Sequence, residues 1–197
     1  MDQTHTPYLG ISIQVSLSGY SFKTRSEEQE HRSPWMGAER LFTTPEFQRR
    51  YEEVEISLLT PKVALIPESF YNPGAARPAL SEVAALEEGD YVESVNVPAL
   101  AAVLVYSNTI GESLSRVVAQ TVLPESGSPV RVFPELYYQL RQLETLSEYN
   151  KIVASWADGW LHLVIAQGKS LCLPMCLQPR ISLRQNISSS SVLSVCS

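Results

Sequence analysis

Few residues in this chain have the types and the spacing that catalysis requires. His162 follows the Asp158-Gly159 pair closely, and a histidine beside a carboxylate can act as a general acid or base. A strand histidine more often packs in the interior or faces solvent, so both interpretations stay open for His162. The other two histidines, His5 and His31, sit in polar segments without a candidate partner. We therefore predict no catalytic residue.

Metal and nucleotide motifs are also missing from the sequence. Cys172 and Cys176 have no second pair of ligands for a zinc site, and Cys196 stands far from them. The chain contains no GxGxxG, no Walker A pattern and no GxSxG. We therefore predict no metal site.

Length and composition set the class of protein. The 197 residues (21.9 kDa) fit one domain, or one domain and part of a second. A hydrophobic content of 44% with 18% charged residues predicts a packed core. A net charge of −6 argues against nucleic acid as a partner. With no membrane span and no signal peptide pattern at the start, we expect a cytoplasmic protein.

The first half of the sequence reads mainly as strands. Residues 9–15 alternate between apolar and polar, and the pattern resumes at 20–23, which predicts a hairpin. Residues 24–39 are polar and predict a loop. Thr44-Pro45-Glu46 is typical of a helix start. The β-rich runs that follow predict a second hairpin or a bent strand; they are residues 54–59 and 63–66.

The second half alternates strands and helices, which predicts an α/β domain with a partly parallel sheet. A short helix is expected around Leu80, and strands at 91–97 and 101–106, the latter buried on both faces. We expect further helices over 109–118 and from Pro134, with a strand at 129–133 between them. The last expected strands form a meander with tight turns; they are residues 151–155, 160–166 and 170–173.

This order of elements resembles the duplicated actin-like ATPase (ribonuclease H-like) fold, and more narrowly a PilM-like family of bacterial proteins of unknown function. The resemblance rests on LGISIQVSLSGYSF, TPKVALIPESFYN, EGDYV, AVLVYS and KIVASWADGWLHLVIAQGKSLCL. It covers nearly everything up to Leu173. It implies a complete first lobe over residues 1–148 and the opening strands of a second lobe over 149–173.

The resemblance also implies two turns that would hold the phosphates of a nucleotide. The first corresponds to Ser16, Ser18 and Gly19, where this chain keeps a glycine but lacks the carboxylate of the family pattern. The second turn corresponds to Asp158 and Gly159, which supply both the carboxylate and the glycine of the family pattern. Asp-Gly is also a common hairpin turn, so a plain hairpin stays open as the other interpretation of each site.

The last 24 residues, 174–197, differ from the rest. They contain seven serines and no Asp, Glu, Lys, Gly or aromatic residue, so they offer no helix to cover the sheet that has just begun. With a suitable choice of permitted codons, reading two bases later can yield NVSAAADFTTAEYFIFLCAQ, an amphipathic string that resembles the continuation of the family. We predict a frameshift near Leu173; a naturally disordered tail is the alternative.

The resemblance implies a function without cofactor, as a non-catalytic protein-binding or scaffold module. The alternatives are a weak Mg-ATP-binding or ATP-hydrolysing protein that uses Asp158, and a truncated product without function. Trp156 and Trp160 flank the Asp158-Gly159 turn and are candidates for a partner surface.

Overall fold

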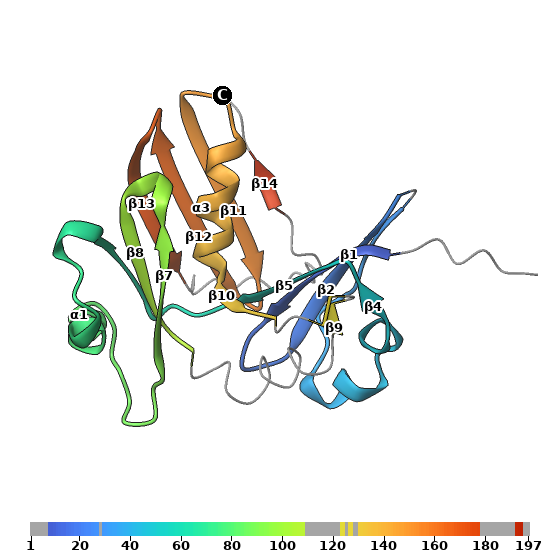
Figure 1. Cartoon of the computed structure of the whole chain (residues 1–197). Helices are drawn as coiled ribbons and strands as arrows, with labels where there is room; N and C mark the ends of the chain where they lie inside the picture. The colour runs from blue at the N-terminus through green and yellow to red at the C-terminus, as the bar shows by residue number, and fades with distance from the viewer. Residues whose placement is uncertain are drawn as a thin grey trace, which may run out of the picture. The chain divides into compact units, whose positions relative to one another are not determined.

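The computed structural model in Figure 1 describes residues 8–27, 29–108, 123–124, 126–127, 130–177 and 192–194. The chain divides into two compact units. Unit 1 comprises Met1–Leu58 and Ile110–Val132, and unit 2 comprises Leu59–Thr109 and Phe133–Ser197. This is a division by contacts; the division into lobes at residue 148 stays a prediction.

Unit 1 is built on a five-stranded mixed sheet in the order β10-β5-β1-β2-β3. Strand β1 pairs antiparallel with β2 and parallel with β5, so Ile13 lies between Phe22 and Ile56. The apolar alternation of β1 buries one face of the sheet against Tyr20, Phe47 and neighbouring side chains. The strands of this sheet are β1 (Tyr8–Val15), β2 (Tyr20–Ser26), β3 (Glu30–Arg32), β5 (Glu53–Leu58) and β10 (Val132–Pro134). A small parallel pair consists of β4 (Arg50–Tyr51) and β9 (Leu123–Pro124).

Unit 1 confirms the first hairpin and corrects two expectations. The loop expected over 24–39 contains the end of β2, the whole of β3 and part of η1 (Ala38–Thr43). The expected helix is only the 3-10 turn η2 (Pro45–Gln48). The reason lies in Thr44: its hydroxyl donates to the carbonyl of Arg40 (2.9 Å) and bonds the Tyr20 hydroxyl (2.6 Å), so it caps nothing.

The second hairpin is also wrong, although both of its strands exist. Strand β5 pairs with β1, whereas β6 (Val63–Pro67) belongs to another sheet and pairs with β8. Each strand found its partner far away in the sequence, which local patterns do not reveal.

Unit 2 contains a three-stranded antiparallel sheet in the order β6-β8-β7, covered on both faces. Its other strands are β7 (Val92–Val97) and β8 (Ala102–Ser107), and the helix on one side is α1 (Ala76–Ser81). Leu104 faces the core shared with α3, while Val103 and Val105 face Leu80 of α1. Every residue of β8 is buried, which confirms the strand expected to be covered on both faces; its pairing, however, is antiparallel.

A buried carboxylate fixes the loop before β7. Asp90 accepts from Lys62 Nζ (2.7 Å), from the hydroxyl of Ser107 (2.9 Å) and from the amide of Glu87 (2.6 Å). Arg77 donates to the Asp90 carbonyl. Asp90 of the EGDYV segment therefore has a structural role, which is to hold this loop through hydrogen bonds.

The second sheet of unit 2 has the order β13-β12-β11-β14 and is antiparallel throughout. Helix α3 packs on β11 and β12. Its elements are α3 (Glu135–Thr145), β11 (Asn150–Ala157), β12 (Trp160–Gln167), β13 (Ser170–Leu177) and β14 (Val192–Ser194). The predicted meander and the helix from Pro134 are confirmed, with longer strands than expected.

Some expectations fall outside the described residues, notably the helix over 109–118 and the greater part of the tail after Leu177. In the described part of the tail, β13 continues to Leu177 and β14 pairs with β11. No helix within the described ranges is long and apolar enough to cross a membrane.

Candidate functional site

The first candidate turn joins β1 to β2 and is held by its own hydrogen bonds. The amide of Ser16 donates to the carbonyl of Gly19 (2.9 Å), and the amide of Ser18 donates to the hydroxyl of Ser16 (3.0 Å). The indole of Trp35 donates to the hydroxyl of Ser18 (2.9 Å). These two amides are engaged within the turn, whereas a phosphate site needs amides that point at the ligand.

The close approach of the neighbouring backbone explains why residue 19 is a glycine. Its φ is +155°, and a Cβ at this position would lie 2.0 Å from the carbonyl oxygen of Met36. The close approach comes from the bridge between Tyr20 and Met36, whose amides and carbonyls pair in both directions at 2.8 Å. A glycine is required here by the neighbouring backbone of this chain, without any ligand.

The second candidate turn is a two-residue hairpin between β11 and β12. Ala157 pairs with Trp160, which leaves Asp158 (φ +50°) and Gly159 (φ +75°) as the central residues. Two central residues with positive φ are typical of a type I′ turn, for which Asp-Gly is a preferred sequence. The hairpin interpretation therefore accounts for both residues. The first turn belongs to unit 1 and the second turn to unit 2. A nucleotide site formed by the two turns stays a prediction.

His162 lies in the core, beneath α3, and not in an exposed site. Its side chain is 3% exposed, and its neighbours across the sheet are Ser155 on β11 and Cys176 on β13. The Nε2 of His162 is 3.7 Å from the Sγ of Cys176, and Gln139 of α3 donates to the carbonyl of His162 (3.0 Å). The packed interpretation of His162 is the one that this geometry favours.

Burial makes both groups of this pair poor participants in acid/base chemistry near neutral pH. It lowers the pKa of the His162 imidazole below its ordinary value, against the smaller opposing effect of the Glu135 carboxylate. It raises the pKa of the Cys176 thiol to about 12, so the reactive thiolate is suppressed. Among the described residues, no group of three or more His, Cys, Asp and Glu side chains could hold a metal ion.

The feature of unit 2 that stands out is the face of the β11-β12-β13 sheet opposite α3. On the α3 side, Val153 and Val164 are buried at 1% and 0% exposure. Their immediate neighbours along the strands point to the other side, where the side chains of the central residues are apolar and most are half-buried. We call this surface the open face; the register places on it Ile152, Ala154, Trp156, Leu161, Leu163, Ile165, Met175 and Leu177.

The described part of the chain supplies no cover for the open face. None of its residues belongs to the three hydrophobic clusters that the described residues form, whereas Val153, Val164 and Ala166 all do. Leu177 is 42% exposed. The expected partner surface around the tryptophans is corrected in one respect: Trp156 lies on the open face, but Trp160 shares the α3 side with His162.

Sequence reasoning missed the open face. Residues 160–166 are apolar at nearly every position, so a period of two did not show which side was which. The signal that could have found it is the polar row of Ser155 and His162, because these two residues alternate with the apolar set. Polar residues of a half-buried strand usually mark its outer side, whereas here they mark the inner one.

Comparisons with solved structures define the class of fold. The chain is similar to a Bacteroides thetaiotaomicron protein with actin-like ATPase fold and unknown function (14% identity, TM-score 0.62), over 90% of this chain and 72% of that one. It is also similar to a chain of a PilM-PilN type IV pilus biogenesis complex (12% identity, TM-score 0.55), over 86% of this chain and 61% of that one. The chain therefore has an actin-like ATPase fold, as the resemblance implied.

The family follows from the sequence match. Residues 10–174 match the model described as "Protein of unknown function (DUF3822)", so the chain belongs to this family. None of the curated proteins matches the chain. The duplicated lobes and the truncation remain predictions.

The burial of His162 makes stability depend on pH. Since its folded pKa is lowered, the unfolded chain binds a proton more readily below about pH 6.5, and the free energy of unfolding decreases as the pH falls through that range. We expect His162→Gln to flatten this dependence between pH 7 and 5, measured by urea unfolding. His31→Gln, at an exposed residue of β3, is the control and should leave the slope unchanged. Equal slopes in the parent and in His162→Gln would contradict the assignment.

Proposed function

We propose that the chain is a non-catalytic protein-binding module and that it binds its partner through the open face. The observation that carries the proposal is the apolar character of this whole face, which contrasts with the polar row under α3. Contiguous apolar surface is rare on monomers and commonly marks a protein interface. The partner is expected to contribute an apolar surface of its own.

The composition of the open face fits such an interface. Trp156 and Met175 are residue types that are enriched in interfaces. The residues of the open face include no Lys, Glu or Asp. The centre of the sheet, with Leu163 between Ala154 and Met175, offers a continuous apolar area without a charged side chain. Burying each large side chain there would contribute about 1.5–3 kcal/mol before the costs of association.

The similarity to known assemblies supports the same proposal. One solved structure of similar fold is a chain of a PilM-PilN type IV pilus biogenesis complex. A protein partner and a scaffolding role in the present chain are in keeping with that likeness.

The absence of a role for nucleotide is part of this proposal. Gly19, Asp158 and Gly159 are each accounted for by their hairpins, and the first turn has no carboxylate to orient a metal-bound water. The proposed module therefore works without ATP or magnesium.

We also propose a second explanation of the open face, in which the segment of chain that would cover it is missing. The family match ends at residue 174, where the composition changes, and the frame that gives NVSAAADFTTAEYFIFLCAQ would supply an amphipathic helix. In this account residues 174–197 are out of frame, and the open face has lost its own cover.

Substitutions at two adjacent residues of β12 test the first proposal. Val164→Lys would place a charge in the buried α3 side and should cost more than about 4 kcal/mol of stability. Leu163→Lys, on the open face, should cost less than about 1 kcal/mol in urea unfolding. It should also reduce the fluorescence of the hydrophobic dye ANS and abolish the capture of partner protein from cell extract.

Val83→Lys is the matched control, since Val83 is 66% exposed in the same unit and lies away from the open face. It should retain capture. If Leu163→Lys unfolds the chain as Val164→Lys does, the face is already covered, and the proposal fails.

Titration with Mg-ATP tests the role of nucleotide. We expect no rise in the melting temperature, because the amides of Ser16 and Ser18 in the first turn are already bonded and the second turn is a hairpin. Stabilisation that disappears in Asp158→Ala would establish the ATP-binding alternative.

A chain repaired from residue 174 separates the two proposals. If the tail is out of frame, the repaired chain should give more soluble protein, unfold at higher urea concentration and bind less ANS, because its helix covers the open face. The genomic DNA should then carry an intact downstream frame. An interrupted downstream frame, or a repaired chain that still binds ANS and captures partner, would leave the first proposal standing.

A further inference from the structure

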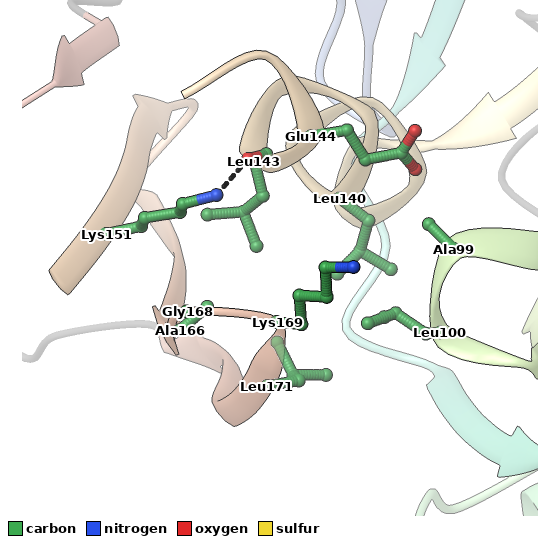
Figure 2. A pocket seen from close by; sticks show the side chains of 10 residues that line it. All are labelled: Ala99, Leu100, Leu140, Leu143, Glu144, Lys151, Ala166, Gly168, Lys169 and Leu171. Atoms are coloured by element: carbon green, nitrogen blue, oxygen red, sulfur yellow. Dashed lines mark hydrogen bonds between the residues drawn. The ribbon is translucent and has the colours of Figure 1, made fainter. Parts of the chain in front are cut away.

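Unit 2 contains a pocket on the α3 side of the sheet, separate from the open face. Its volume is about 370 Å³, within the range of small-molecule sites. Three segments form it: η5 (Pro98–Leu100), the C-terminal half of α3, and the β11-β13 meander around the Gly168-Lys169 turn. The floor consists of leucines, as Figure 2 shows, and they are Leu100, Leu140, Leu143 and Leu171.

The charges of this pocket are arranged unevenly. Residues 150–177 contain only two basic side chains, Lys151 and Lys169, and both line the pocket. In Figure 2 the Lys169 side chain extends from its turn toward α3, and the Glu144 carboxylate points away from Lys151. The pocket therefore has an apolar floor beside a rim that carries two lysines and one carboxylate, Glu144.

The two lysines play different parts. The amino group of Lys151 donates to the carbonyl of Leu143 (3.1 Å), at the C-terminal turn of α3, where a cation offsets the negative end of the helix dipole. Lys169 is exposed, and among the described residues it has no hydrogen-bond or ion-pair partner. Its amino group is thus available for an anion, while Lys151 removes the repulsion that the helix end would otherwise exert.

Gly168 keeps Lys169 in place. With φ at +57°, it forms the first central position of the turn between Gln167 and Ser170, and its amide donates to the carbonyl of Tyr149 (2.6 Å). The turn is therefore tied to the residues just before β11. The cation sits on a short, anchored loop above the leucine floor.

From this arrangement we propose that the pocket binds a small aliphatic carboxylate, with its hydrocarbon chain on the leucine floor and its carboxylate on Lys169. An aliphatic chain removes apolar surface from water on both sides. A charge-assisted hydrogen bond from an ammonium group fixes the head group. A neutral alcohol lacks the second interaction, and an amine of the same length is repelled by both lysines.

Calorimetric titration of the full chain with sodium octanoate, below its critical micelle concentration, tests this site. Octanoate should bind, and its affinity should fall as salt is added. Octylamine, which has the same chain and the opposite charge, and acetate, which lacks the chain, should each bind at least tenfold more weakly. Lys169→Ala should weaken octanoate about tenfold, whereas Lys169→Arg should stay within threefold.

Two controls exclude other sites. Lys23→Ala, which removes an exposed lysine of unit 1 paired with Glu30, should leave the affinity unchanged. Leu163→Lys should also leave it unchanged, because Leu163 lies on the opposite side of the sheet. Equal binding of octanoate and octylamine, an unaltered affinity in Lys169→Ala, or loss of binding in Leu163→Lys would each overturn the proposal.

Discussion

The packing of α3 across β11 and β12 is the contact on which the account of this protein depends. Leu136, Leu140 and Leu143 recur at helical spacing and bury themselves against Val153 and Val164 on one side of the sheet. The same helix also packs against the β6-β8-β7 sheet through Leu104 and its neighbours. The described residues of unit 2 are therefore layered as α1, sheet, α3 and sheet, and the open face is the outer side of the last layer.

The two sheets of unit 2 differ in how many of their faces are covered. The β6-β8-β7 sheet lies between two helices, and all six residues of β8 are buried. Among the described residues a helix covers the β11-β13 sheet on one side only, and β11 and β12 each bury every second residue over most of their length. An apolar sheet with one uncovered side is incomplete, and either a partner or a further segment of chain must complete it.

The polar residues of the β11-β13 sheet are distributed unevenly between its two faces. Within the described chain, the hydroxyl of Ser155 and the side-chain carbonyl of Gln139 are buried on the α3 side without a hydrogen-bond partner, at a cost of about 1–3 kcal/mol each. The central part of the opposite face, where polar residues would cost nothing, has none, and the polar Asn150 and Gln167 lie at the strand ends on that side. A sheet that faced solvent on that side would be expected to show the reverse pattern. The apolar open face is therefore best understood as a surface that is buried in the working protein.

Local sequence patterns predicted the elements better than their partners. The alternation in 9–15, the apolar run of β8 and the stripe of α3 were each sufficient to predict their element. The parallel pairing of β5 with β1 and the pairing of β6 with β8 depend on contacts between distant segments, and the sequence does not show them. Thr44 looked like a helix cap, yet a tertiary bond to Tyr20 uses its hydroxyl. Asp158 and Gly159 looked like part of a phosphate site, and backbone geometry accounts for them as a hairpin turn.

The central claim, that the face opposite α3 is uncovered in the isolated chain, can be measured through its methyl groups. A soluble paramagnetic agent broadens the NMR signals of methyls that solvent reaches. The account predicts strong broadening for Ile152, Leu163 and Ile165 and little for Val153 and Val164. Equal protection of both sets would contradict it, because the open face would then be covered by the chain itself.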